Sequence, residues 1–566
     1  MLNLLLAVLL LSWDADHRGA TIDNGEIKMH IAANGNVNSV RYADQEMIQP
    51  GKNGNVYFNF VSDSIRDVRL DADTAIVLRH TDELIEIVYA SSKHPKGWKW
   101  QVGYILRKGV SGYYTYATVE TEPYETDKYD GCLHEARIVH RLNPQIFNYV
   151  WVSDDNQGPH PSSATLKSHI GQIQDATFYL PDSTIYTKYD YCNYVKDDQL
   201  HGMMGDKVGA WLITPSFEWV NGGVNKQELT AHGDNRSPLI LQMFQSWHFG
   251  AGPARFNRGD RKMYGPALVY FNQGSRQQMI ADAKKQTTQE LDAYPYQWMQ
   301  HELFPLKRGN VTGTIALDKA FGTTCFQVVL AQQGGDWTQQ GHDYQFWAET
   351  DEMGNFNIEN VRPGNYNLYA YALNGGATGQ LTKDGIHVKA GQNQLGTIKW
   401  ELPKYDEIIW RIGDADHRSA GFRLSDHRRQ YGMFKEVPEN LTYFIEECTP
   451  SDNWYYAQTK NGNWDILFNL DEIYQNPLRL TIATAGAANR TRARILVNGK
   501  RIGEIKTDND SGIYRCAQQS GQPGLFTFDI KPELFKKGKN TITLNVYNIK
   551  NVGGIMYDCI KLEANK

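Results

Sequence analysis

Residues 98–120 read WKWQVGYILRKGVSGYYTYATVE, two runs of aromatic and β-branched side chains separated by the turn-forming segment KGVSG. Aromatic and β-branched residues favour strands, and the glycines between the runs favour a tight turn. The stretch therefore predicts two strands joined by a turn. It carries no helical period of apolar residues, so it indicates a β-sheet protein.

Short strands of the same kind continue on both sides, from about residue 22 to about residue 270. They include IKMHIAANGNVNSVRY, TAIVLRH, LIEIVYASS and ARIVHRLN, each bounded by turn residues. Roughly 250 residues of this pattern predict one large antiparallel β-sandwich. A helix is expected at 275–291, SRQQMIADAKKQTTQEL, where it closes this first domain.

Two further strand-rich units follow. The stretch TDEMGNFNIENVRPGNYNLYAYA alternates at period two with glycine and proline at its turns, which predicts a small β-sandwich over about 309–400. The remaining 160 residues or so contain evenly spaced strands, which suggests a jelly roll. We therefore expect an all-β chain with domains at 21–303, 304–403 and 404–566.

Composition narrows the function classes. The chain has 566 residues, of which 41% are hydrophobic and 22% charged, as in an ordinary soluble protein. With a net charge of −6, the chain lacks the excess of basic residues that is typical of a nucleic-acid-binding protein. Aromatics reach 12%, with 32 Tyr and 14 Trp. Such an excess is common where proteins stack on sugar rings, although strand propensity alone also accounts for it.

The N-terminal residues 2–12, LNLLLAVLLLS, form an apolar run that is too short to span a bilayer and suits the core of a signal peptide. A basic segment before it is missing, and WDADHRGA is a poor cleavage site. We expect a signal peptide at 1–20 in preference to a truncated start, and hence a secreted or periplasmic protein. No other stretch approaches membrane-spanning length.

Two minor features carry less information. The six cysteines show no zinc-binding spacing, so free thiols and one or two disulfides are equally compatible with the sequence. The pentapeptide DADHR occurs at 14–18 and again at 414–418, and it has no recognisable metal-ligand geometry.

The first candidate site is HEARIVHRLN at 134–143. In a strand, Arg137 and Arg141 share one face with Glu135 and Val139, because side chains repeat every two residues. Two arginines on one face are often a solvated strand. Alternatively, they bind a carboxylate through their forked donors.

The second candidate is TKYDYCNYVKDDQLHG at 187–202, which contains Lys188 and His201. Among its tyrosines Lys188 is either a lysine whose stem covers the rings while its ammonium reaches water, or a desolvated lysine that acts as a base.

The third candidate, residues 209–252, places His232 and His248 among Trp211, Trp219 and Trp247. A histidine beside tryptophan is often structural. The functional interpretation is proton transfer beside aromatic platforms that stack on sugars. No nucleophile elbow, phosphate-binding loop, dinucleotide fingerprint, HExxH or EF-hand motif is present. Paired carboxylates for glycoside hydrolysis stay open.

These stretches resemble the rhamnogalacturonan endolyases of polysaccharide lyase family 4. GYYTYA, EARIVHRLN, TKYDY…DDQLHG, WLITPSFEWVNGG..KQELTAH and SWHFGAG are similar to family motifs and occur in the family's order. DYQFWAETDEMGNFNIENVRPGNYNLYAYA resembles the middle domain, and IIWRIGDADHRSAGF with NWYYAQ…NWDILFNL resembles the start of the third. The resemblance implies a galactose-mutarotase-like sandwich, a fibronectin-type-III-like or prealbumin-like domain and a galactose-binding-like jelly roll.

The resemblance also implies a reaction. The family cleaves the α-1,4 bond between rhamnose and galacturonate in rhamnogalacturonan I by β-elimination. Such an enzyme must offset the uronate charge, remove the C5 proton and protonate the leaving oxygen. By motif, Arg137 matches the substrate-binding arginine, Lys188 the essential lysine and His248 the essential histidine. We expect Lys188 to be the C5 base and His248 the acid, with the reverse assignment open.

The remaining site expectations follow from the same motifs. Arg141, Tyr189, His201 and Trp247 are assigned to substrate binding. Tyrosines that fungal members carry before the histidine are replaced here by Leu241 and Met243, so Tyr189, Tyr191 and Tyr194 are candidates to stand in for them.

Cofactors and partners complete the expectations. No cofactor is expected for catalysis, whereas a structural Ca²⁺ stays open. The expected partner is rhamnogalacturonan I, with no nucleic acid, no membrane and a monomeric state. A lyase-derived carbohydrate-binding protein and a glycoside hydrolase on a similar sandwich are the rival hypotheses.

Overall fold

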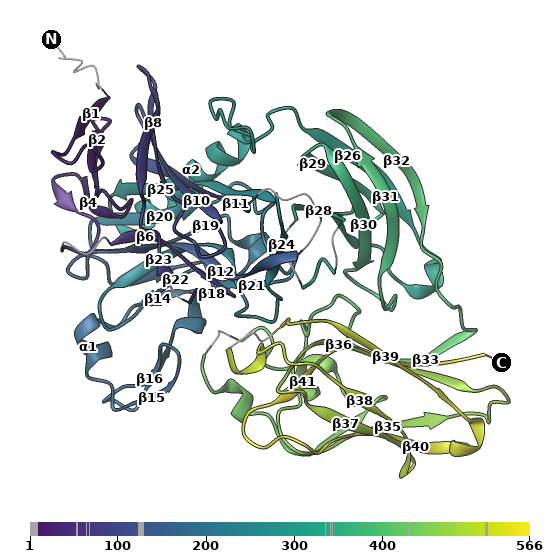
Figure 1. Cartoon of the computed structure of the whole chain (residues 1–566). Coiled ribbons are helices and arrows are strands. Elements are labelled where there is room, and N and C mark those ends of the chain that lie inside the picture. Colours follow the sequence, from purple (N-terminus) through teal and green to yellow (C-terminus); the bar gives the residue numbers. More distant parts are fainter. Residues whose placement is uncertain are drawn as a thin grey trace.

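The computed structural model describes residues 9–51, 55–63, 65–66, 68–122, 129–333, 336–339, 341, 343–427, 430–515 and 519–565. These residues form three β-sandwiches (Figure 1). The large one lies on the left of the figure, the second at upper right and the third at lower right. The all-β class expected from the sequence is confirmed.

The large sandwich consists of an 11-stranded and a 9-stranded sheet. The 11-stranded sheet contains β1 (Leu10–Trp13), β2 (Ala20–Asp23), β3 (Ile27–Ile31), β4 (Val37–Tyr42), β5 (Gln45–Glu46), β6 (Val56–Ser62), β7 (Val68–Arg69), β12 (Tyr129–Arg141), β22 (Ala231–Gly233), β23 (Pro238–Gln245) and β24 (Ala254–Asn257). The 9-stranded sheet contains β8 (Thr74–His80), β9 (Leu84–Ser91), β10 (Lys99–Arg107), β11 (Gly112–Glu120), β13 (Tyr149–Trp151), β14 (Gln157–Pro159), β19 (Leu200–Met204), β20 (Val208–Ile213) and β25 (Arg261–Gln273).

The stretch 98–120 forms the antiparallel pair β10 and β11, as predicted. Trp100 and Tyr104 on β10 point into the core between the two sheets. Ile105 on β10 and Tyr116 on β11 lie in a second core, together with residues of helix α2 (Arg276–Ala293). Both faces of this sheet are therefore buried, which explains why the stretch carries apolar side chains in both registers.

Helix α2 confirms the helix expected at 275–291. Ser275 caps it by accepting a hydrogen bond from the Gln278 amide, and the Gln278 side chain accepts one from the Ser275 amide in return. This capping box satisfies two amides at the helix N-terminus, where the helix itself offers no acceptor.

Small elements of the first sandwich surround the candidate site. They are α1 (Ser163–Lys167), the sheet of β15 (Gly171–Gln174), β16 (Thr177–Tyr179) and β17 (Ile185–Thr187), the 3₁₀ turn η1 (Lys188–Tyr191), the turn η2 (Val195–Asp197), and the pair β18 (Cys192–Tyr194) and β21 (Gln227–Leu229).

The second sandwich pairs a three-stranded with a four-stranded sheet. Its strands are β26 (Gly309–Ala316), β27 (Phe326–Gln332), β28 (Gln345–Glu349), β29 (Asn355–Val361), β30 (Gly364–Ala372), β31 (Leu381–Val388) and β32 (Gly391–Lys399). A turn η3 (Lys319–Phe321) connects β26 to β27, and a separate apolar core fills the space between the sheets.

The third sandwich pairs a four-stranded with a five-stranded sheet around its own core. Its strands are β33 (Glu407–Ile412), β34 (Leu441–Phe444), β35 (Gly462–Leu470), β36 (Leu478–Ala488), β37 (Arg492–Val497), β38 (Lys500–Lys506), β39 (Gly524–Ile530), β40 (Gly538–Val546) and β41 (Gly554–Ala564). Its helical elements are η4 (Met433–Lys435), α3 (Pro450–Asn453), η5 (Ile513–Arg515) and η6 (Pro532–Leu534).

The N-terminal run contributes a strand to the first sandwich. Leu10 to Trp13 form strand β1, which pairs with β2 at the edge of the 11-stranded sheet. Among the described residues β1 is the first strand, and it lies within the segment 1–20 that was expected as a signal peptide. Residues 1–8 of that segment lie outside the described residues.

The repeated pentapeptide DADHR adopts the same turn twice. His17 and His417 have φ of 54° and 61°, and the second Asp of each copy accepts a hydrogen bond from the arginine amide that follows. The first copy comes directly after β1, and the second follows β33 with Gly413 between them. The repeat therefore encodes a local turn. In the second copy the ring of His417 also stacks on Tyr371 of the second sandwich, with centroids 4.1 Å apart.

Two further observations concern cysteines and membranes. No disulfide joins any two of the five cysteines within the described ranges, and Cys516 lies outside those ranges. Of the helices that the structure describes, none combines the length and the apolarity needed to cross a bilayer.

Candidate active site

The exposed face of the 11-stranded sheet carries a cavity of about 520 Å³. Alternate residues of β12 line it, while Ala136 and Ile138 between them point into the core. The prediction that Arg137, Arg141, Glu135 and Val139 share one face is therefore confirmed. The cavity is lined by Tyr57, Val61, Glu135, Arg137, Val139, Arg141, Asp175, Ala176, Lys188, His232, Asp234, Arg236, Leu239, Leu241, Trp247, His248 and Arg515.

Lys188 begins the 3₁₀ turn η1, directly after β17. It is only 5% exposed, so it is not a lysine whose ammonium reaches bulk water. Its Nζ donates a hydrogen bond to Asp175 at 2.5 Å and lies 5.2 Å from the ring centroid of Tyr189. Asp175 keeps a largely exposed side chain, and its partial desolvation favours the neutral form, but the Lys188 ammonium outweighs this and holds the carboxyl pKa below its usual value.

His248 lies on the segment after β23 and is 4% exposed. Its Nδ1 is 3.6 Å from a carboxylate oxygen of Glu228, and its Nε2 is 3.8 Å from one of Glu135. Burial and the Lys188 ammonium lower the imidazole pKa, whereas the two carboxylates oppose that shift. The Lys188 ammonium therefore acts on the charge of His248.

The two arginines of β12 differ in how their donors are used. Arg137 contacts Glu135 at 2.5 Å, and its buried Nε finds no hydrogen-bond partner in the described part of the chain. Arg141 is 4% exposed and binds both oxygens of Asp234, at 3.1 and 2.9 Å. Arg137 therefore has donor capacity left for a ligand, while the guanidinium of Arg141 is largely occupied.

Two aromatic residues predicted for the site lie next to it. Tyr189 is 1% exposed, and its ring meets the His248 ring edge-on with centroids 6.2 Å apart. Trp247 is 49% exposed and lines the cavity, as expected of a platform for a sugar ring. None of the three candidates to replace the missing tyrosines, Tyr189, Tyr191 and Tyr194, is among the residues that line this cavity.

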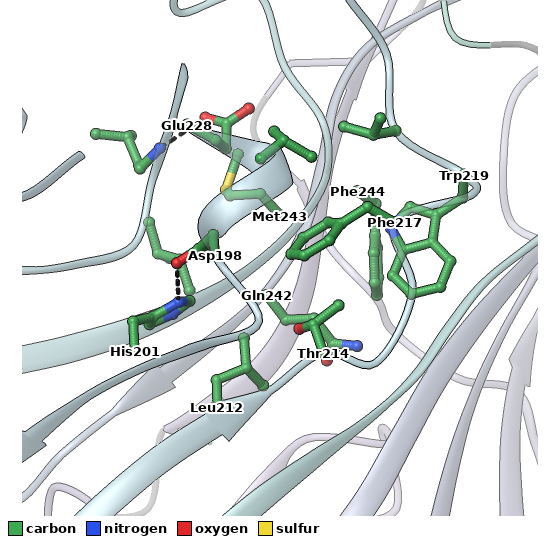
Figure 2. Close-up of a pocket in the computed structure, with 14 residues that line it drawn as sticks. Asp198, His201, Leu212, Thr214, Phe217, Trp219, Glu228, Gln242, Met243 and Phe244 are labelled. Carbon is green, nitrogen blue, oxygen red and sulfur yellow. Dashed lines mark hydrogen bonds and ion pairs between the residues drawn. The ribbon is translucent and has the colours of Figure 1, made fainter. Parts of the chain in front are cut away.

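His201 lies elsewhere, so its expected contact with substrate in this cavity is wrong. It is 2% exposed and its Nδ1 bonds Asp198 at 3.0 Å beside a separate, very small internal cavity (Figure 2). The period of β19 turns His201 toward the inside of the sandwich, and the K…H-G spacing alone did not reveal this. Met243 also lines that internal cavity, whereas Leu241 lies between the two cavities and borders both.

His232, which the sequence placed among tryptophans, lines the larger cavity and is buried. Burial, the Lys188 ammonium and Arg137 hold its pKa well below the ordinary histidine value, although Asp234 opposes them. It is therefore a neutral imidazole at neutral pH.

Several residues that line the cavity or contact His248 escaped sequence reasoning. Asp175 and Tyr57 belong to segments without any distinctive motif. Glu228 lies within the conspicuous stretch KQELTAH but was not singled out. Arg515 comes from the third sandwich, where its guanidinium donates to the carbonyl oxygen of His248 and lies 5.5 Å from the Tyr189 ring centroid. No local pattern predicts a contact across so much intervening chain.

This arrangement is suited to one kind of chemistry. Arg137, Lys188 and Arg515 supply positive charge for an anionic ligand, and a buried lysine and a buried histidine provide two proton-transfer groups. Within the described ranges, no group of three or more His, Cys, Asp or Glu side chains is placed to hold a metal ion.

Family models match three parts of the chain. A model described as the rhamnogalacturonate lyase family matches residues 9–175. Models described as domain II and domain III of polysaccharide lyase family 4 match 307–395 and 408–562.

Individual proteins are also similar. A rhamnogalacturonate lyase of Dickeya dadantii (strain 3937) is 31% identical, covering 97% of this chain and 93% of its own length. A rhamnogalacturonate lyase B of Emericella nidulans is 27% identical, covering 71% of this chain and 68% of its own length. Among solved structures, a putative aldose 1-epimerase from Escherichia coli K12 matches 47% of this chain with a TM-score of 0.25 and 9% identity.

Proposed function

This chain belongs to the rhamnogalacturonate lyase family, polysaccharide lyase family 4, and from this premise we propose that it cleaves rhamnogalacturonan I by β-elimination. The family that the sequence motifs predicted is thereby confirmed. The observation that carries the proposal is the gathering of Arg137, Lys188 and His248 around one cavity on the exposed face of the sheet.

The bond proposed to break is the α-1,4 link between rhamnose and galacturonate. A base removes the proton at C5 of the galacturonate, the C5–H electrons form a C4–C5 double bond, and the C4–O bond breaks. The leaving oxygen takes a proton and becomes a hydroxyl of the departing chain. The neighbouring carboxylate makes the C5 proton only weakly acidic, so its charge must be offset.

Arg137 offsets this charge in our proposal, because its unpaired Nε can complete a forked interaction with the uronate carboxylate. Lys188 takes the C5 proton and His248 protonates the leaving oxygen. Burial and the Lys188 ammonium lower the pKa of His248, whereas the Glu228 and Glu135 carboxylates oppose that shift and favour the imidazolium that protonates the leaving oxygen.

A spectroscopic assay tests the function. Incubation with rhamnogalacturonan I is expected to produce ultraviolet absorbance from the unsaturated uronate, and turnover should persist with a chelator present. New reducing ends without that absorbance would indicate a hydrolase. Binding without cleavage would indicate a carbohydrate-binding protein. Because a pectic polymer is met outside the cell, this function agrees with a secreted or periplasmic enzyme.

Replacing Trp247 tests the proposed sugar platform. Trp247→Ala is expected to raise KM about 2- to 10-fold with little change in kcat, since stacking contributes mainly to ground-state binding. Steady-state kinetics on rhamnogalacturonan I measure both constants. Trp13→Ala is a matched control, because Trp13 is 38% exposed on the edge strand β1 and does not line the cavity. An unchanged KM in Trp247→Ala would contradict a platform role.

A further inference from the structure

A buried polar network lies next to Nδ1 of His248. Glu228 on β21 is 5% exposed, and one of its oxygens is the nearest carboxylate oxygen to Nδ1 of His248, at 3.6 Å. That Nδ1 is buried and finds no hydrogen-bond partner among the residues the structure describes. In a site without bound ligand, hydrogen bonds of catalytic groups are often long. The distance between Nδ1 and the Glu228 oxygen can therefore shorten to a hydrogen bond when substrate binds.

Glu228 is itself firmly held. Its carboxylate accepts hydrogen bonds from the Ser246 hydroxyl at 2.5 Å and the Leu229 amide at 2.9 Å, and it pairs with the Lys226 ammonium at 2.7 Å. Lys226 in turn donates to the side-chain oxygen of Asn221 at 2.7 Å. Although burial opposes ionisation, Lys226 and His248 hold the Glu228 carboxyl pKa far below its usual value. Glu228 is therefore a fixed anion.

We propose that Glu228 is a positioning residue that fixes the orientation, tautomer and charge of His248. This inference rests on the proposed function, because His248 is the histidine assigned to proton transfer. A carboxylate at Nδ1 keeps the proton on that nitrogen, so that Nε2 faces the cavity and exchanges a proton with the ligand. In the stretch KQELTAH, Lys226 pairs with Glu228, and Glu228 orients His248.

The charge around His248 comes from several elements. The anionic groups around it are Glu135 on β12, Asp175 before β16 and Glu228 on β21. The cationic groups are Arg137 on β12, Lys188 on η1, Lys226 just before β21 and Arg515 from the third sandwich. The ring of Tyr189 on η1 also faces it. Among the carboxylates of the described residues, Glu228 is the one within 4 Å of Nδ1. Its removal therefore subtracts a stabiliser of the imidazolium while leaving the cations in place.

Glu228→Gln is the informative substitution, because it keeps the size and one acceptor oxygen but removes the charge. We expect the imidazole pKa of His248 to fall by about one unit or more, since an opposite charge within hydrogen-bonding reach raises it by that order. We expect kcat to fall about 10- to 100-fold, as for other carboxylates that orient a histidine. KM should stay unchanged, because Glu228 does not line the cavity.

The pH profile gives a readout that a merely structural role would not move. If His248 is the acid, activity is lost as pH rises through its pKa, so the alkaline limb of kcat shifts to lower pH in Glu228→Gln. If His248 is the base, the acidic limb shifts to lower pH instead. Nitrogen-15 NMR of the histidine rings measures the pKa and the tautomer directly, with His248→Asn identifying the resonance.

Two further variants keep the test decisive. The double variant Glu228→Leu with Lys226→Met removes the acceptor without leaving an unpaired buried ammonium. In this variant the His248 ring should lose its preference for a proton on Nδ1. Glu349→Gln is the matched control, because Glu349 pairs with Lys196 at 2.9 Å away from the cavity. An unchanged pKa and tautomer for His248 in Glu228→Gln would overturn the proposal. A parent protein that forms no unsaturated uronate would overturn the proposed function alone, since the NMR titration stands without turnover.

Discussion

Lys188→Ala and His248→Ala are each expected to reduce turnover of rhamnogalacturonan I by about 10²- to 10⁴-fold, the usual contribution of a general base or acid. Both side chains are buried at one cavity, 5% and 4% exposed, and neither role passes readily to a neighbour. The initial rate of ultraviolet absorbance measures the loss. We expect the fold to persist in Lys188→Ala, because its partner Asp175 is largely exposed and stays solvated without the lysine. Thermal unfolding checks this.

A change of leaving group separates the two roles. A uronide with a nitrophenyl group on the C4 oxygen needs no acid, because its leaving oxygen is stable as an anion. On that substrate His248→Ala should recover much of its rate, whereas Lys188→Ala should not. The opposite pattern would reverse the assignment of base and acid. Near-normal activity of both variants on the polysaccharide would contradict a catalytic role for either residue.

Lys196→Ala is the matched control for the lysine. Lys196 follows eight residues after Lys188 in the neighbouring turn η2, but it pairs with Glu349 and does not line the cavity. Its removal is expected to leave turnover unchanged.

Glu218→Gln is expected to lower the free energy of unfolding by about 3–5 kcal/mol, the typical effect of removing one partner from a buried ion pair. Glu218 is 1% exposed and lies between Arg308 at 2.7 Å and Arg362 at 2.5 Å, where the first and second sandwiches meet. Burial opposes its ionisation, but the two guanidinium groups hold its pKa below the usual value. Without the carboxylate, two buried cations face each other.

Urea unfolding followed by fluorescence measures this change. The double variant Glu218→Gln with Arg362→Met should recover part of the lost stability, because it removes one of the unpaired charges. Lys404→Met is the control, since its pair with Asp318 is exposed and its loss should change the free energy of unfolding little. A loss in Glu218→Gln no larger than in this control would contradict a stabilising role for the carboxylate.

The sequence predicted the elements well where the signal was local. The hairpin of β10 and β11, the strand periodicity of β12 and the capped helix α2 all follow from neighbouring residues, because side-chain alternation and capping act over a few positions. The turn repeated at DADHR belongs to the same class, since each copy satisfies its own backbone through its own aspartate.

The candidate site was predictable only in part. Arg137, Lys188, Trp247 and His248 were named from motifs, and the structure brings them to one cavity. His201 was misplaced, because the sequence does not tell which face of β19 turns inward. The pairing of the Arg141 guanidinium with Asp234 was also not predictable from the sequence, because the two residues lie on different segments.

By itself, the sequence determined the all-β class and the family, and it supplied the arginine, lysine and histidine to which the proposed elimination is assigned. Only the tertiary structure decided that Lys188 is buried, that Glu228 faces Nδ1 of His248, and that Arg515 reaches the cavity from the third sandwich. The physical reason is that burial and charge depend on which distant segments pack together. Local sequence fixes backbone conformation over a few residues and carries little information about such contacts.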